Sequence, residues 1–111
     1  MARIGYTRND DLKYEAVVIL DEVSGDSMEF QRAFAFDDQD RESGMDTYCL
    51  VRGDATHYGG LASWSLAGDV LRLRLDQLAA AALELPRVVE IPVVADDLEP
   101  FHAHLARITS G

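Results

Sequence analysis

The sequence predicts an α+β domain built mainly from antiparallel strands. Six segments of apolar or alternating side chains follow one another at short intervals, which is typical of an antiparallel meander. The clearest alternation sets Leu71, Leu73 and Leu75 against Arg72 and Arg74, as in a strand with one buried face. Near the end of the chain, apolar residues recur at helical spacing. We therefore expect a mainly antiparallel sheet of about six strands, a short alanine-rich helix and a C-terminal amphipathic helix packed on the sheet.

Turn-forming residues separate the predicted strands, which cover residues 15–23, 28–36, 46–52, 56–66, 70–75 and 87–94. In the second strand, Phe30, Phe34 and Phe36 recur at even positions, so an aromatic face should turn inward. Gly59 and Gly60 interrupt the fourth strand; they indicate a bulge at which the strand bends, or close contact with a ligand.

Two helices follow from capping and spacing. Asp76 is a suitable N-cap for a helix through Leu85, where Leu78 and Ala82 continue the packing face and Pro86 prevents extension. The last strand contains a proline at position 92, which restricts it to an edge or margin of the sheet.

The C-terminal helix has the clearest signature. Asp96 and Glu99 resemble a capping box at its start, and the residues that follow at helical spacing are Leu98, Phe101, Leu105 and Ile108. Residues 1–14 show no comparable pattern, and we expect a loosely ordered extension there. The chain should otherwise form a single domain over residues 1–111.

Composition limits the classes of function. Ten Lys and Arg against twenty Asp and Glu give a net charge of −10, which argues against nucleic-acid or anionic-membrane partners. The N-terminus has no apolar stretch typical of a signal peptide, and Cys49 cannot form an internal disulfide, so we expect a cytoplasmic protein. Negative charge is concentrated between Asp21 and Asp54, where ten carboxylates face three arginines beside aromatic residues; this arrangement favours a protein-binding surface.

Catalytic and metal-binding patterns are weak. Cys49 and His57 are the one candidate nucleophile and base, but Cys49 lies between apolar neighbours, where an inert thiol is common. His102 and His104 are two residues apart on the predicted helix, so they do not share a face on which to hold a metal. We expect no catalytic residues, no metal and no cofactor.

The run Gln39–Val51, which contains Gly-Met-Asp-Thr-Tyr-Cys, together with the later Tyr58-Gly59-Gly60, resembles the immunity protein 10 family of bacterial polymorphic toxin systems. The similarity extends from about Glu15 to the final helix. One departure is Glu84, where we expect a glycine near the end of the alanine-rich helix. The resemblance implies a small cytoplasmic protein that binds and neutralises a cognate toxin domain without catalysis.

On that basis, the partner is a toxin domain with a basic active-site cleft, such as a nuclease, which the acidic surface would occlude. The expected partner-binding residues are Asp37, Asp38, Asp40, Glu42, Met45, Asp46, Tyr48 and Tyr58. Two other functions stay open from the residues alone: an adaptor that binds peptides along a sheet edge, and a small enzyme that uses Cys49 and His57. Neither the chemistry of the toxin nor the oligomeric state follows from the sequence.

Overall fold

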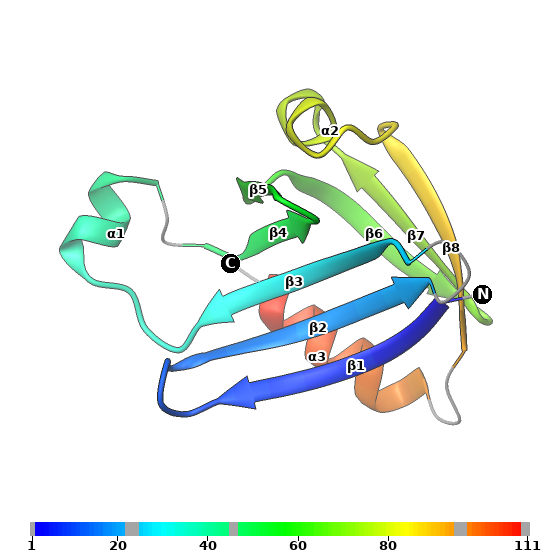
Figure 1. The fold of residues 1–111 in the computed structure, drawn as a ribbon, viewed down its shortest axis with the longest axis horizontal. Helices are drawn as coiled ribbons and strands as arrows, with labels where there is room; N and C mark the ends of the chain where they lie inside the picture. The colour runs from blue at the N-terminus through cyan, green and yellow to red at the C-terminus, as the bar shows by residue number, and fades with distance from the viewer. Residues whose placement is uncertain (1, 22–24, 45–46, 95–97, 110–111) are drawn as a thin grey trace.

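The computed structural model describes residues 2–21, 25–44, 47–94 and 98–109. Eight strands and three helices follow in the order β1 (Ala2–Asn9), β2 (Tyr14–Asp21), β3 (Ser27–Ala33), α1 (Asp38–Glu42), β4 (Cys49–Arg52), β5 (Ala55–Tyr58), β6 (Leu61–Ala67), β7 (Val70–Leu75), α2 (Gln77–Leu83), β8 (Val88–Val94) and α3 (Leu98–Thr109). The strands form one sheet in the order β5-β4-β3-β2-β1-β8-β7-β6 (Figure 1). The fold is α+β with a mostly antiparallel sheet, as predicted, but it has eight strands where the sequence suggests about six.

The first additional strand is β1, which replaces the loosely ordered extension expected over residues 1–14. It pairs antiparallel with β2 along its length and makes a short parallel contact with β8, from Ala2 and Arg3 to Val93 and Val94. Only Ala2 of this strand is buried. The apolar alternation that identifies a half-buried strand is therefore weak in β1, and its pairing partners place it in the sheet.

The second additional strand arises because the predicted strand 56–66 is divided at its two glycines. Gly59 and Gly60 have φ angles of +71° and +91°, which do not occur in a regular strand. They carry the chain from β5 at one end of the sheet order to β6 at the other. The expected bulge is thus a complete break at which the chain changes from one half of the sheet to the other.

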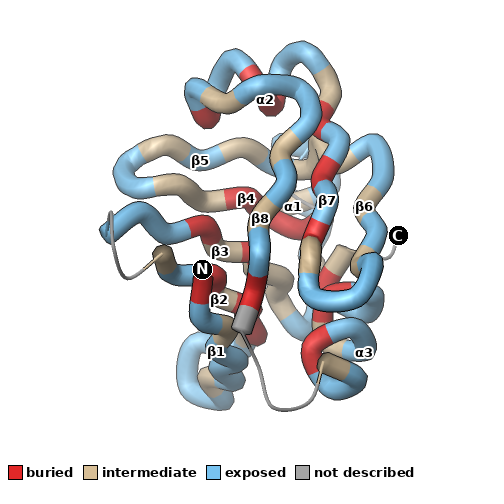
Figure 2. Tube along the Cα trace, turned by 90° about the vertical axis from the view of Figure 1, so that its right-hand side faces the viewer, coloured by how far each residue is buried: buried red, intermediate tan, exposed pale blue. Residues whose placement is uncertain are grey.

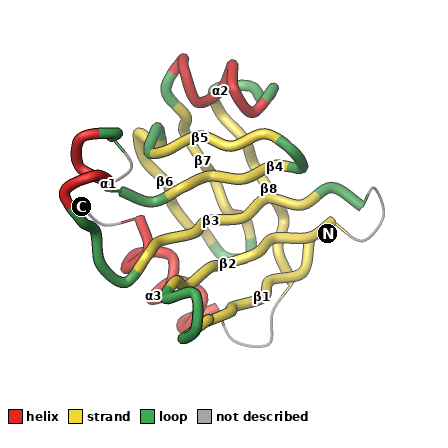
Figure 3. Tube along the Cα trace, turned by 60° about the vertical axis from the view of Figure 1, so that its left-hand side comes forward, coloured by secondary structure: helices red, strands yellow, loops and turns green. Residues whose placement is uncertain are grey.

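The core lies between the two halves of the sheet. Strands β6–β8 and helix α3 cover the same face of β1–β3 (Figures 1 and 3), and buried positions occur on each of these elements except β6, whose inward side chains are half-buried (Figure 2). The largest side chains that are fully buried are Phe30, Leu50, Leu71, Leu73, Leu75, Leu83, Leu105 and Ile108. The predicted inward leucines of β7 and the predicted packing residues of α3 are therefore confirmed.

Two predicted apolar faces need correction. Strand β3 ends at Ala33, so Phe34 is 41% exposed and lies under the guanidinium of Arg8, whose Cζ is 4.6 Å from the ring centroid. In α2, Asp76 caps the helix as predicted, but Leu78 is 73% exposed and Ala79 faces the core. The small side chains of α2 face inward because the helix packs closely against the Gly60 backbone: a Cβ atom on Gly60 would lie 2.5 Å from that of Ala79.

The last strand, β8, is internal, between β1 and β7. Pro92 pairs with Val70 on the β7 side, and the β1 contact begins only at Val93. Among the described residues, none of β1 pairs with Pro92, so the missing N–H of the proline interrupts no described β1–β8 hydrogen bond. The predicted cap of α3 at Asp96 lies outside the described residues.

Candidate partner-binding surface

Helix α1 carries exposed carboxylates and contributes no buried residue to the core. It begins with a capping box: the Asp37 carboxylate accepts from the Asp40 N–H at 2.8 Å, and the Asp40 carboxylate accepts from the Asp37 N–H at 3.0 Å. Arg41 donates to Asp38 at 3.1 Å. The helix projects from one end of the molecule (Figure 1). Four carboxylates and one guanidinium thus form an ordered acidic element in solvent.

Beside α1, the outer face of β2–β5 contains a hollow of about 240 Å³. Its lining residues are Tyr14, Gln31, Arg32, Ala33, Phe36, Asp40, Thr47, Cys49 and Tyr58. The strand register places Gln31 opposite Cys49 and Cys49 opposite Tyr58, so these three side chains share one face of the sheet. No helix covers that face in Figure 1. We call α1 with Asp37 and this hollow the acidic surface.

The predicted partner-binding residues occupy three settings. Asp37, Asp38 and Glu42 are exposed on or next to α1, while Asp40 and Tyr58 line the hollow, where Tyr58 is 42% exposed. Tyr48 is 8% exposed and belongs to the core. Met45 and Asp46 lie outside the described residues.

The Tyr48 hydroxyl connects the residue before β4 to the start of β6. The hydroxyl accepts from the N–H of Leu61 at 3.0 Å and lies 3.4 Å from the Leu61 carbonyl. In addition, the Gly59 N–H donates to the Tyr48 carbonyl at 2.9 Å. Tyr48 therefore anchors the start of β6 to β4, and it is not part of the acidic surface.

Two aromatic residues of the hollow, Tyr14 and Phe36, are not among the predicted partner-binding residues. Tyr14 pairs with Ala33 at the end of the β2–β3 ladder, and Phe36 lies past the end of β3 with the Arg32 guanidinium 5.6 Å from its ring centroid. Tyr14 falls within the predicted extension, and Phe36 within a predicted strand. Strand β3 ends at Ala33, so the alternation that predicts an inward-facing Phe36 does not continue as far as that residue. Phe36 instead lines the hollow beyond the end of the strand.

The sequence model of the immunity protein 10 family matches residues 1–99. The chain belongs to this family of immunity proteins. The match begins at the first residue and therefore includes β1, which the resemblance from Glu15 onward leaves out, and it ends within α3. No curated protein and no solved structure matches the chain.

In this immunity protein, Cys49 and His57 do not form a nucleophile and base. Cys49 is opposite Tyr58 and His57 is opposite Leu50, so the side chains of Cys49 and His57 point to opposite faces of the β4–β5 hairpin. Burial raises the pKa of the Cys49 thiol, which disfavours the reactive thiolate. The geometry required for the small-enzyme alternative is therefore missing at this pair.

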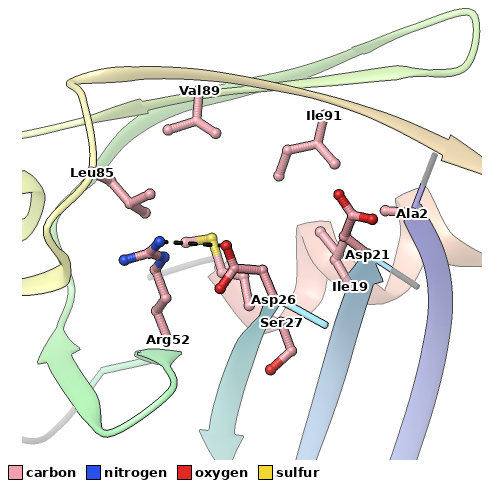
Figure 4. A pocket seen from close by; sticks show the side chains of 10 residues that line it. Ala2, Ile19, Asp21, Asp26, Ser27, Arg52, Leu85, Val89 and Ile91 are labelled. Atoms are coloured by element: carbon pink, nitrogen blue, oxygen red, sulfur yellow. Dashed lines mark ion pairs between the residues drawn. The ribbon is translucent and has the colours of Figure 1, made fainter. Parts of the chain in front are cut away.

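A second opening lies between the two halves of the sheet, with a volume of about 180 Å³ (Figure 4). Its walls include Ile19, Val89 and Ile91, and the Arg52 guanidinium pairs with Asp26 at 3.5 Å. Arg52 also donates to the Leu83 carbonyl at 3.0 Å, so it joins β4 to α2. This slot is smaller than typical small-molecule sites, which measure about 300–1,000 Å³. Arg52 here acts as a structural tie.

Within the described part of the chain, no group of three or more His, Cys, Asp or Glu side chains is arranged to hold a metal ion. Among the helices of these residues, none is long and apolar enough to cross a membrane.

Proposed function

We propose that this immunity protein neutralises its cognate toxin domain in the cytoplasm by covering the toxin's active site with the acidic surface, without catalysis. The proposal rests on the way α1 is held in place and exposed. This helix is held by its own capping box and buries none of its residues, so the core does not require its carboxylates. An ordered charged element that contributes little to the core is well suited to recognition.

The charge of the surface indicates the kind of toxin. Exposed carboxylates beside aromatic side chains complement a cleft lined by lysine and arginine. Nucleases have such clefts because they bind the phosphate backbone of nucleic acid. We therefore propose a nuclease-like toxin whose basic cleft receives α1, with Tyr58 at the rim of the contact.

Two measurements test the proposal: binding of this protein to the toxin domain encoded next to its gene, and inhibition of that toxin domain by this protein. Asp38→Asn with Glu42→Gln removes two exposed charges from α1 and leaves the capping box intact, and we expect about tenfold weaker binding. Asp69→Asn with Glu90→Gln removes the same charge from exposed positions on the β6–β8 half. This control should bind as the wild type does.

Calorimetry and an assay of toxin activity should be run on the same preparations. Equal weakening by both double variants would show that only net charge matters, and would contradict the assignment of α1. Tight binding that leaves the toxin active would contradict occlusion of the active site.

A further inference from the structure

Strand β6 forms one edge of the sheet, and its segment from Ser63 to Ala67 lacks the usual protection of an edge strand. It is the last strand in the sheet order, and its sequence, Leu-Ala-Ser-Trp-Ser-Leu-Ala, has neither charge nor proline. Soluble proteins commonly blunt such edges with lysine, proline, a bulge or a covering element, because the free N–H and C=O groups otherwise recruit another strand. The absence of a charge is notable in a chain with 27% charged residues.

The opposite edge of the sheet, formed by β5, has a helix packed against it. There, α2 packs against β5 (Figure 3), and a Cβ atom on Gly60 would touch Ala79 of α2. Within the described residues, the backbone of β6 beyond Leu61 is bonded only to β7. Its contact with α3 is made by side chains: the Trp64 indole N–H donates to the Thr109 hydroxyl at 3.1 Å. That bond orients the indole and leaves the strand edge open.

The regular part of this edge is centred on Ser65. A register shift between Leu61 and Ser63 disturbs the first residues of β6, and the pairing with β7 is continuous from Ser63 to Ala67. An antiparallel ladder leaves every second residue of this segment with its N–H and C=O directed away from β7.

We infer that β6 pairs antiparallel with β6 of a second copy of this chain, about a two-fold axis at Ser65. Ser65 then faces Ser65 of the other copy, Trp64 faces Leu66, and Ser63 faces Ala67. None of these cross-strand pairs includes a charge, and an aromatic side chain beside an aliphatic one is favourable in a sheet. The same strand can therefore supply both sides of the contact, as an isologous contact requires, and the free N–H and C=O groups of both β6 edges are then bonded to each other.

Electrostatics favour this half of the molecule as the contact. Residues 61–94 contain three arginines and four carboxylates, a net charge of −1 out of the total of −10. The remaining residues carry the other nine net negative charges, so self-association through them meets more repulsion on average. Arg72 lies on β7 opposite Ser65, so it is about 14 Å from its counterpart across three strand spacings, and Arg74, opposite Ser63, is farther from its own. This separation exceeds the Debye length of about 8 Å at physiological salt.

The inference is independent of the proposed function, because α1 and the hollow lie on the β2–β5 half and are not part of the pairing. Sedimentation of the full chain over a range of concentrations at physiological salt tests it directly. The wild type should shift from 12.3 kDa toward twice that mass as concentration rises.

Ser65→Glu and Ser65→Lys each place like charges opposite one another on the axis, and each alone should weaken self-association about tenfold. An equimolar mixture of the two should recover it as a heterodimer, because opposite charges then meet. Thr56→Glu, at an exposed position on β5, is the matched control and should self-associate as the wild type does.

A wild type that stays monomeric at every concentration would overturn the inference. Self-association that Ser65→Glu leaves unchanged would place the contact elsewhere on the molecule. Weakening in both single variants without recovery in the mixture would contradict the two-fold axis at Ser65. Thermal melts of each variant confirm that the compared proteins are folded.

Discussion

Glu84 shows how one residue can end a helix at a cost. It follows α2 with φ 56° and ψ 46°, the left-handed conformation that glycine adopts without penalty and other residues do not. The family resemblance leads us to expect glycine near this point, and the backbone has kept the geometry that glycine favours. The side chain of Glu84 is exposed, so no packing interaction offsets the strain of this backbone conformation.

Replacement of Glu84 by glycine should therefore raise the free energy of unfolding by about 0.5–1 kcal/mol, measured by urea denaturation. Glu84→Ala removes the same carboxylate but keeps the Cβ atom, and it should give no comparable gain. An equal gain in both variants would show that the charge, and not the backbone conformation, is responsible.

Among the glycines that the structure describes, Gly60 is distinguished because both its conformation and its surroundings exclude a side chain. Gly60→Ala should lower the free energy of unfolding by at least about 1–3 kcal/mol, because a positive φ is strained and the new Cβ would lie 2.5 Å from that of Ala79. Gly68 also has a positive φ, of +60°, but open space around it. Gly68→Ala measures the strain alone, and a loss there as large as at Gly60 would contradict the packing argument.

At the scale of elements, the end of α3 is attached to the sheet by a polar cluster. Arg107 donates to the two carboxylate oxygens of Glu15 at 2.8 and 3.2 Å, and the Tyr6 hydroxyl donates to Glu15 at 3.0 Å. Arg107 also contacts the His104 ring, which stacks on Tyr6 with centroids 3.7 Å apart. Glu15 is the only buried charged residue in the described part of the chain, and this cluster compensates its charge.

The cluster predicts an acid-sensitive contribution to stability. The hydrogen bond from Arg107 lowers the pKa of Glu15 below its usual value. Because the folded pKa lies below the unfolded one, this contribution is present above the ordinary glutamate pKa of about 4.3 and is lost as pH falls through the folded value. Glu15→Gln should cost about 1–3 kcal/mol at pH 7.

Urea denaturation of wild type and Glu15→Gln at neutral pH and at about pH 3 measures this contribution. The difference between the two proteins should shrink on acidification. A difference that stays constant over this range would contradict the role of the Glu15 charge.

For the molecule as a whole, the sequence identifies elements whose burial alternates strongly. The leucines of β7 and the apolar face of α3 could be recognised because each has one buried and one solvent-facing side. β1 could not, because its position depends on pairing with β2 and β8 and it buries only Ala2. The break at Gly59 and Gly60 was visible as an interruption, but only the tertiary contact with Ala79 explains its extent.

Only the acidic part of the candidate surface can be predicted from the sequence. The carboxylates of α1 stand out by composition, since charge density needs no structure to be seen. The sequence predicts Tyr48 as a partner-binding residue because it follows the acidic run, whereas its burial and its hydroxyl bonds to Leu61 place it in the core. Tyr14 and Phe36 reach the hollow only through the register of β2 with β3 and the end of β3.

The two halves of the molecule differ in charge, as expected if α1 steers the protein onto a basic toxin cleft. Stopped-flow association with the toxin domain, measured at low and at physiological salt, tests that claim most directly. We expect the wild-type association rate to fall about tenfold with salt. Asp38→Asn with Glu42→Gln should flatten this dependence, and Asp69→Asn with Glu90→Gln should not. An association rate that is independent of salt, or equally affected by the two double variants, would contradict it.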